Sequence, residues 1–170
     1  MDALNTRISP SSADLCSPVR SSIDGLWSRP LKVMPGKGGP VLHMLRADSP
    51  HFTAFGEIYF SLLDREAIKA WKKHRRQSQN FACPQGRILL AAYDERENSP
   101  SLGRLETFVL GLPDDYRLLH VPPGIIYGFT ALDDAPAVLA NCADLPHDPE
   151  ESESIPADSP LVPYTWGVKC

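Results

Sequence analysis

The chain has 170 residues, 42% hydrophobic and 22% charged, with a formal net charge of −4. This length fits one domain with a substantial core, and the acidic balance argues against nucleic-acid binding, which favours a basic surface. No apolar run reaches the roughly 20 residues of a membrane-spanning helix, and the N-terminal stretch lacks the apolar core of a signal peptide. A cytoplasmic protein with no membrane partner is therefore expected.

The first part of the chain differs in composition from the rest. Residues 1–22 are rich in serine and proline and show no hydrophobic period, so a flexible or swapped N-terminal arm is expected there. Residues 23–170 are expected to form a single domain. Within it, residues 146–160 are acidic and proline-rich and predict an irregular C-terminal segment.

Short strands separated by turns account for most of the chain. The 17 prolines and 11 glycines punctuate apolar runs that recur roughly every 8–12 residues, which is typical of an all-β sandwich or barrel. The strands are predicted at residues 26–27, 31–34, 41–46, 56–62, 68–77, 86–96, 106–110, 117–121, 128–132 and 137–142. Turns are predicted at residues 35–40, 97–103, 113–115, 122–124 and 133–134. No window has sustained helical periodicity.

The run at 68–77 is unusual because cations occur at neighbouring positions. If it is a strand, Lys72 and His74 lie on one face, and Lys69 and Trp71 lie on the other. Cations that line a cavity suit an anionic ligand, whereas lysines on an exposed edge strand protect it from aggregation. The local pattern leaves both interpretations open.

Metal and disulfide chemistry find no support in the sequence. The four cysteines have no C-x-x-C spacing and are expected to be free thiols in a reducing compartment. No two of the five histidines form the His-x-His pair of a metal-binding cupin, so no metal and no cofactor are expected. His51 and His147 are expected to be solvent-exposed loop residues.

Residues 121–129 (VPPGIIYGF) combine a rigid Pro-Pro-Gly turn with an aromatic side chain. Tyr127 is placed to carry its phenol into whatever the turn faces. The alternative is a core tyrosine with a hydrogen-bonded hydroxyl.

Six stretches in order carry a family resemblance. They are residues 39–43 (GPVLH), 69–72 (KAWK), Gly86, 94–103 (DERENSPSLG), 121–129 (VPPGIIYGF) and 158–166 (DSPLVPYTW). Together they resemble the dTDP-4-dehydrorhamnose 3,5-epimerase family, whose members modify nucleotide sugars. The resemblance implies an all-β cupin-type jelly roll and a homodimer.

The resemblance also implies a catalytic set, from which this chain departs. Family members remove a proton beside a ketone with a histidine paired to a carboxylate, and a tyrosine on the opposite side delivers the proton. The gap-free match places Lys72 at the histidine position and Ala140 at the tyrosine position, while Tyr127 replaces a second histidine. A shift of two residues would instead place His74 at the base position.

Two main functions follow as alternatives, beside a third, a carbohydrate or organic-acid cupin unrelated to nucleotides. The first is a nucleotide-deoxysugar epimerase or isomerase whose base is either Lys72, if burial and neighbouring cations lower its pKa, or His74, with Tyr127 as acid. The second is a non-catalytic nucleotide-sugar-binding cupin of polysaccharide or glycosylated-metabolite biosynthesis. The expected ligand is a dTDP-4-keto-6-deoxyhexose or a similar sugar nucleotide. Its predicted binding residues are His43, Lys69, Trp71, Arg87, Arg96 and Asn141.

Overall fold

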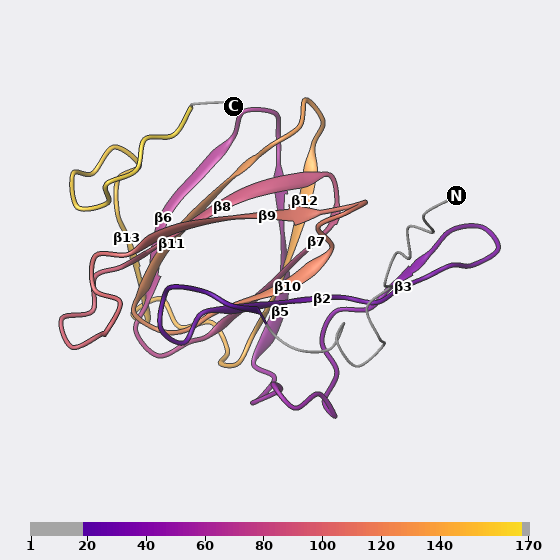
Figure 1. Ribbon diagram of the computed structural model, residues 1–170, viewed down its shortest axis with the longest axis horizontal. Helices are drawn as coiled ribbons and strands as arrows, with labels where there is room; N and C mark the ends of the chain where they lie inside the picture. Colours follow the sequence, from indigo (N-terminus) through magenta and orange to yellow (C-terminus); the bar gives the residue numbers. More distant parts are fainter. Residues whose placement is uncertain (1–18, 168–170) are drawn as a thin grey trace, which may run out of the picture.

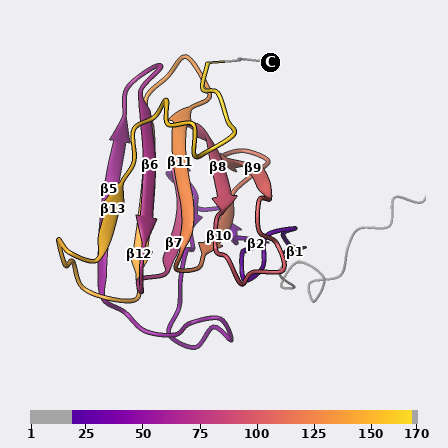
Figure 2. The ribbon, with the colours of Figure 1, turned by 90° about the vertical axis from the view of Figure 1, so that its left-hand side faces the viewer.

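The computed structural model describes residues 19–167, which form a two-layer β-sandwich (Figure 1, Figure 2). A six-stranded sheet has the order β1-β2-β10-β7-β12-β5, a five-stranded sheet has the order β13-β6-β11-β8-β9, and β3 and β4 form a separate hairpin. The strands are β1 (Val19–Arg20), β2 (Trp27–Pro30), β3 (Val33–Met34), β4 (Val41–Leu42), β5 (Glu57–Leu63), β6 (Ile68–His74), β7 (Gln79–Gln85), β8 (Arg87–Asp94), β9 (Leu105–Gly111), β10 (Arg117–Val121), β11 (Ile125–Ala131), β12 (Ala137–Ala143) and β13 (Ser152–Ser154). The predicted all-β jelly roll is confirmed.

The main core lies between the two sheets. Alternate side chains of the strands point inward, and their burial supplies the main driving force for folding. Buried residues of this core include Leu63, Phe81, Ile88, Leu90, Leu119, Ile125, Phe129 and Leu139.

A second, smaller core covers the outer face of the five-stranded sheet. The closing segment of the chain runs across this face (Figure 2), and Ile155 and Val162 pack there against Trp71 and Ile126. The backbones of Trp71 and Ile155 exchange two hydrogen bonds, of 2.8 and 3.0 Å. Residues 155–166 are therefore part of the packed domain.

Most predicted strands are present, and the differences have local causes. β7 was not predicted, because its glutamines, Asn80 and Pro84 have turn-like composition. β11 begins at Ile125 rather than at residue 128, so Tyr127 lies in a strand and not in the preceding turn. β13 lies within the acidic segment that was expected to be irregular.

β6 contains a bulge that changes which side chains share a face. Tyr127 and Phe129 of β11 pair with Lys72 and Lys69 of β6, so two steps along β11 match three along β6. Strict alternation predicted opposite faces for Lys69 and Lys72. The extra residue corrects this, and both lysines line the same cavity.

Some expectations fall on the ends of the chain. The predicted arm at 1–22 lies largely outside the described residues, but Val19 and Arg20 pair with β2 of the same chain. Cys83 and Cys142 are free and buried, whereas Cys16 and Cys170 lie outside the described range. Between residues 19 and 167 there is no helix long and apolar enough to cross a membrane.

The loop between β8 and β9 is organised around the fully buried Asp94. Its carboxylate accepts hydrogen bonds from Arg96 Nε (2.8 Å), Ser99 Oγ (2.6 Å) and Ser101 Oγ (2.6 Å). Arg96 also donates to the carbonyl of Asp24 at 2.7 Å, which ties the N-terminal part of the domain to this loop. Arg96, predicted to bind substrate, is thus engaged in an ion pair with a buried carboxylate.

Replacement of Asp94 by alanine is predicted to destabilise the fold by about 3–5 kcal/mol, because it leaves Arg96 without its buried partner. Burial opposes ionisation, but the hydrogen bonds from Arg96, Ser101 and Ser99 hold the pKa of Asp94 well below its usual value. A lowered folded-state pKa stabilises the protein above about pH 4 and loses that effect as the pH falls. Urea unfolding between pH 7 and 3 should therefore show a weaker acid dependence in Asp94→Ala than in the wild type.

The matched control is Asp133→Ala, which removes a partner of Arg87 from a half-exposed ion pair. Exposed pairs contribute little, so its effect should be much smaller. Equal losses in the two variants would contradict the structural role assigned to Asp94.

Candidate active site

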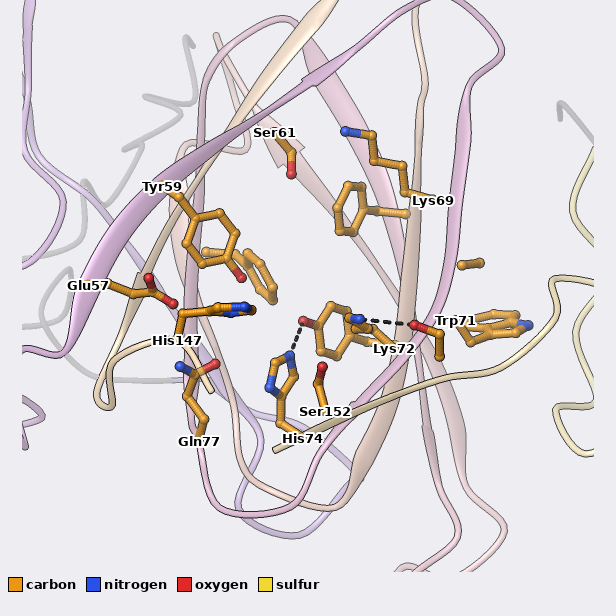
Figure 3. A pocket seen from close by; sticks show the side chains of 15 residues that line it. Glu57, Tyr59, Ser61, Lys69, Trp71, Lys72, His74, Gln77, His147 and Ser152 are labelled. Atoms are coloured by element: carbon orange, nitrogen blue, oxygen red, sulfur yellow. Dashed lines mark hydrogen bonds between the residues drawn. The ribbon is translucent and has the colours of Figure 1, made fainter. Parts of the chain in front are cut away.

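A cavity of about 540 Å³ opens between the sheets where β5 and β6 lie near the sheet edges (Figure 3). The six-stranded sheet contributes β5 and β7, and the five-stranded sheet contributes β6, β11 and β13. The lining residues are Glu57, Tyr59, Ser61, Lys69, Ala70, Trp71, Lys72, His74, Gln77, Phe81, Tyr127, Phe129, His147, Ser152 and Ser154.

A histidine–carboxylate pair lies at one side of this cavity. His74, the last residue of β6, is buried, and its Nδ1 is 2.6 Å from Oε2 of Glu151. Glu151 directly precedes β13, and the antiparallel pairing of Ser152 with His74 brings the two side chains together. The pair therefore depends on a strand contact between residues 77 positions apart in sequence.

Glu151 is held as a carboxylate. Its Oε1 accepts the backbone N–H groups of Arg76 (2.5 Å) and Gln77 (2.8 Å). Burial favours the neutral acid, but these N–H groups and His74 outweigh it and lower the pKa of Glu151. An ionised Glu151 accepts a hydrogen bond from the Nδ1–H group of neutral His74, which leaves Nε2 as the nitrogen with a free electron pair.

Tyr127 of β11 lies next to that nitrogen. Its hydroxyl is 3.1 Å from His74 Nε2, and the two rings are nearly parallel, with an interplanar angle of 8°. Since Nε2 is the acceptor, the Tyr127 hydroxyl donates. Burial, with smaller effects of Tyr59 and Glu151, raises the pKa of Tyr127 well above 10, so the phenol remains protonated.

The cations of β6 are divided between its two faces. On the outer side, Lys73 forms ion pairs with Glu95 (2.6 Å) and Glu153 (2.9 Å). In the cavity, Lys72 Nζ donates to Ser154 Oγ at 3.0 Å, and neither Lys69 nor Lys72 forms an ion pair with another described residue. The cavity thus presents two ammonium groups without a carboxylate partner, which suit an anionic ligand.

Five of the predicted site residues line the cavity, namely Lys69, Trp71, Lys72, His74 and Tyr127. The indole of Trp71 points away from it (Figure 3) into the outer core. Asn141 is buried beneath the lining, where its amide donates to the Tyr59 hydroxyl at 2.7 Å.

Besides Asn141, three predicted binding residues do not line this cavity. Arg87 pairs with Asp133 at 2.6 Å, Arg96 pairs with Asp94 at 2.8 Å, and the carbonyl of His43 accepts a hydrogen bond from Tyr116 at 3.0 Å. The two arginine side chains and the His43 carbonyl therefore make contacts within the domain.

Sequence reasoning missed four titratable residues that line or complete the site. Glu151 lies in an acidic run whose composition is typical of a solvated segment. Glu57 and Tyr59 lie in a predicted apolar strand and were not assigned to the site. His147 is exposed as expected, yet it lies at the cavity. No three His, Cys, Asp or Glu side chains of residues 19–167 come together in a way that could hold a metal ion.

Comparison with known proteins identifies the family. A model of the dTDP-4-dehydrorhamnose 3,5-epimerase family matches residues 67–170, more than half of the chain. The chain belongs to this family. The predicted resemblance is therefore confirmed.

Individual members show the degree of similarity. The probable low-salt glycan biosynthesis epimerase Agl13 of Haloferax volcanii is 33% identical over 145 residues, which cover 83% of this chain and 92% of the relative. The spore coat polysaccharide biosynthesis protein SpsL of Bacillus subtilis is 25% identical over 86% of this chain and 98% of its own length. A dTDP sugar isomerase from Desulfovibrio desulfuricans superimposes with a TM-score of 0.86 at 50% identity, covering 87% of this chain and 94% of the other.

The raised pKa of Tyr127 predicts that its phenol resists titration. In protein labelled with ¹³C at tyrosine Cζ, the Tyr127 signal should not shift by pH 10, where about half of an unperturbed tyrosine is ionised. The signal is assigned by its disappearance in Tyr127→Phe. A Tyr127 signal that moves with an ordinary midpoint would contradict the buried, proton-donating phenol.

Proposed function

We propose that the protein is a nucleotide-deoxysugar epimerase that removes a proton from a carbon beside a 4-keto group, with His74 and Glu151 as the basic pair. The observation that carries this proposal is the 2.6 Å contact between His74 Nδ1 and Glu151 inside a cavity of the epimerase family fold. A carboxylate on one imidazole nitrogen orients the ring and stabilises the imidazolium that forms when the other nitrogen takes a proton.

The same geometry favours His74 over Lys72 as the base. Lys72 has a hydroxyl partner, Ser154, and no carboxylate that would stabilise one protonation state during turnover. We assign Lys72 and Lys69 to the negative charge of the substrate, on its diphosphate or on the enolate oxygen that develops during proton removal. Tyr127 supports the pair by donating to Nε2 until the substrate arrives.

The proposed substrate is a dTDP-4-keto-6-deoxyhexose or a closely similar sugar nucleotide. Support comes from the unpaired lysines of the cavity, from its volume of about 540 Å³, which lies in the usual range for small-molecule sites, and from the name of the 50% identical relative, a dTDP sugar isomerase. The names of the two curated relatives further support a role in glycan or polysaccharide synthesis.

A non-catalytic sugar-nucleotide-binding cupin was the alternative. Binding alone requires the lysines but not a buried carboxylate aimed at a histidine, and a buried charge carries a desolvation cost. The His74–Glu151 pair therefore favours the enzyme.

We also propose a cytoplasmic homodimer. β5 is an edge strand whose alternate residues Ile58, Phe60 and Leu62 are 49, 59 and 71% exposed. An apolar edge of this kind invites pairing with another chain. Free buried Cys83 and Cys142 agree with a reducing compartment.

His74→Asn is predicted to lower proton exchange by about 10²–10⁴-fold, the usual contribution of a general base, and Glu151→Gln is predicted to act in the same direction. Lys72→Ala should keep the exchange and weaken substrate binding. The measurement is NMR of deuterium entering C3 and C5 of dTDP-4-keto-6-deoxyglucose in heavy water, with UDP, GDP and CDP analogues in parallel.

Two outcomes would contradict this assignment. Exchange that survives in His74→Asn and disappears in Lys72→Ala would make Lys72 the base. Tight binding of a sugar nucleotide without exchange on any of the four would favour the binding cupin.

The double variant Phe60→Lys/Leu62→Lys is predicted to convert the dimer to a monomer, because it places charge on the exposed face of β5. Size-exclusion chromatography with light scattering reports the mass. Leu161→Lys, at an exposed apolar position outside β5, is the control and should remain dimeric. A monomeric wild type, or a dimeric double variant, would contradict the proposal.

A further inference from the structure

We propose that Tyr59 is the proton donor on the side of the cavity opposite His74, and that Asn141 holds its hydroxyl in position. This inference rests on the proposed epimerase function. It assigns a residue that the sequence reasoning did not single out.

Inversion of a carbon centre requires two proton positions. The proton leaves one face of the carbon and a proton must return on the other face of the planar enolate, so the donor lies across the substrate from the base. His74 of β6 and Tyr127 of β11 lie on neighbouring strands of one sheet and are hydrogen-bonded to each other. Tyr127 is therefore on the side of the base and is poorly placed to protonate the opposite face.

The opposite wall of the cavity is formed by β5 of the other sheet. Its alternate residues Glu57, Tyr59 and Ser61 line the cavity. Tyr59 extends its ring from this wall with the hydroxyl directed toward the middle of the cavity, across from His74 (Figure 3). A phenol keeps its proton at neutral pH, as a donor must, and is far more acidic than the hydroxyl of a serine.

The contacts of Tyr59 leave its proton available. The amide of Asn141 donates to the Tyr59 oxygen at 2.7 Å and also donates to Oε1 of Gln79. The Tyr59 hydroxyl donates to that same Oε1 only at 3.4 Å, a long and therefore weak hydrogen bond. The oxygen is thus anchored by a donor, while its own proton is free to turn to the substrate.

The same arrangement stabilises Tyr59 after transfer. The Asn141 amide donates to the phenolate and partly offsets burial, which, with Glu57, raises the pKa of Tyr59 above its ordinary value. Asn141 pairs directly with Tyr59 across β12 and β5. Its predicted role in substrate binding is therefore replaced by a positioning role.

The proton balance of the step is closed by solvent. His74 Nε2 takes the proton as the C–H bond breaks and the enolate forms. The Tyr59 O–H bond then breaks as a new C–H bond forms on the other face, which leaves a phenolate and an imidazolium. Water returns a proton to Tyr59 and accepts one from His74, and Tyr59 is 37% exposed, so solvent reaches it.

The test separates proton removal from inversion. Full-length Tyr59→Phe is incubated with dTDP-4-keto-6-deoxyglucose in heavy water, and NMR follows deuterium incorporation and sugar configuration separately. We expect exchange within a few-fold of the wild type, because His74 still removes and returns a proton on its own side, and a loss of inverted product by about 10²-fold or more. Asn141→Ala should lower the ratio of inversion to exchange, which a general loss of stability would not do.

Three comparison variants complete the experiment. Tyr93→Phe, on the outer face of the sandwich, should change neither rate. Glu57→Gln and His147→Asn change the other titratable groups lining the cavity outside β6 and β11, and each should retain inversion.

The outcomes that overturn the proposal are distinct from those that overturn the function. Tyr59 is not the donor if Tyr59→Phe inverts the sugar at the wild-type rate. It is also not the donor if Tyr59→Phe loses both exchange and inversion while its melting temperature is unchanged. Exchange without inversion in Glu57→Gln or His147→Asn would assign the role to one of those residues instead. A wild-type protein that never exchanges or never inverts would instead overturn the epimerase function, and Tyr59 as its donor with it.

Discussion

The pairing of the short strand β13 with β6 is the contact on which the site depends. It brings the Glu151 carboxylate against His74, where the backbone N–H groups of Arg76 and Gln77 keep it ionised. A buried carboxylate without these donors would favour its neutral form and would no longer define which imidazole nitrogen carries the proton. The local backbone after β6 therefore sets the protonation pattern of the cavity.

The distribution of charge on β6 explains a pattern that was ambiguous in the sequence. Lys73 on the outer side forms ion pairs with Glu95 and Glu153, so its charge is neutralised at the surface of the domain. Lys69 and Lys72 share the cavity because of the bulge between them. β6 lies between β13 and β11, so the edge-strand interpretation is wrong, and ligand binding by the two cavity lysines stays a prediction.

Sequence reasoning predicted the all-β architecture because Pro- and Gly-rich turns and short apolar runs indicate where the backbone turns and where it forms strands. It predicted the family from motifs that the structure shows to be partly architectural, since Asp94, Ser99 and Ser101 form one buried hydrogen-bonded loop. It could not predict the pairing of Glu151 with His74, because no local signal distinguishes a solvated glutamate from one delivered to a site by a distant strand.

The position of that glutamate along the chain has a consequence for synthesis. The ten strands that form the rest of the two large sheets, and the β3–β4 hairpin, all precede residue 144. Glu151 and the segment that covers Trp71 follow it. A chain emerging from the ribosome begins folding from its N-terminal end, so the sandwich is encoded before its site is complete. A nascent chain, or one that ends before Glu151, would hold a cavity with lysines but no oriented histidine. The histidine would become oriented only when β13 pairs with β6.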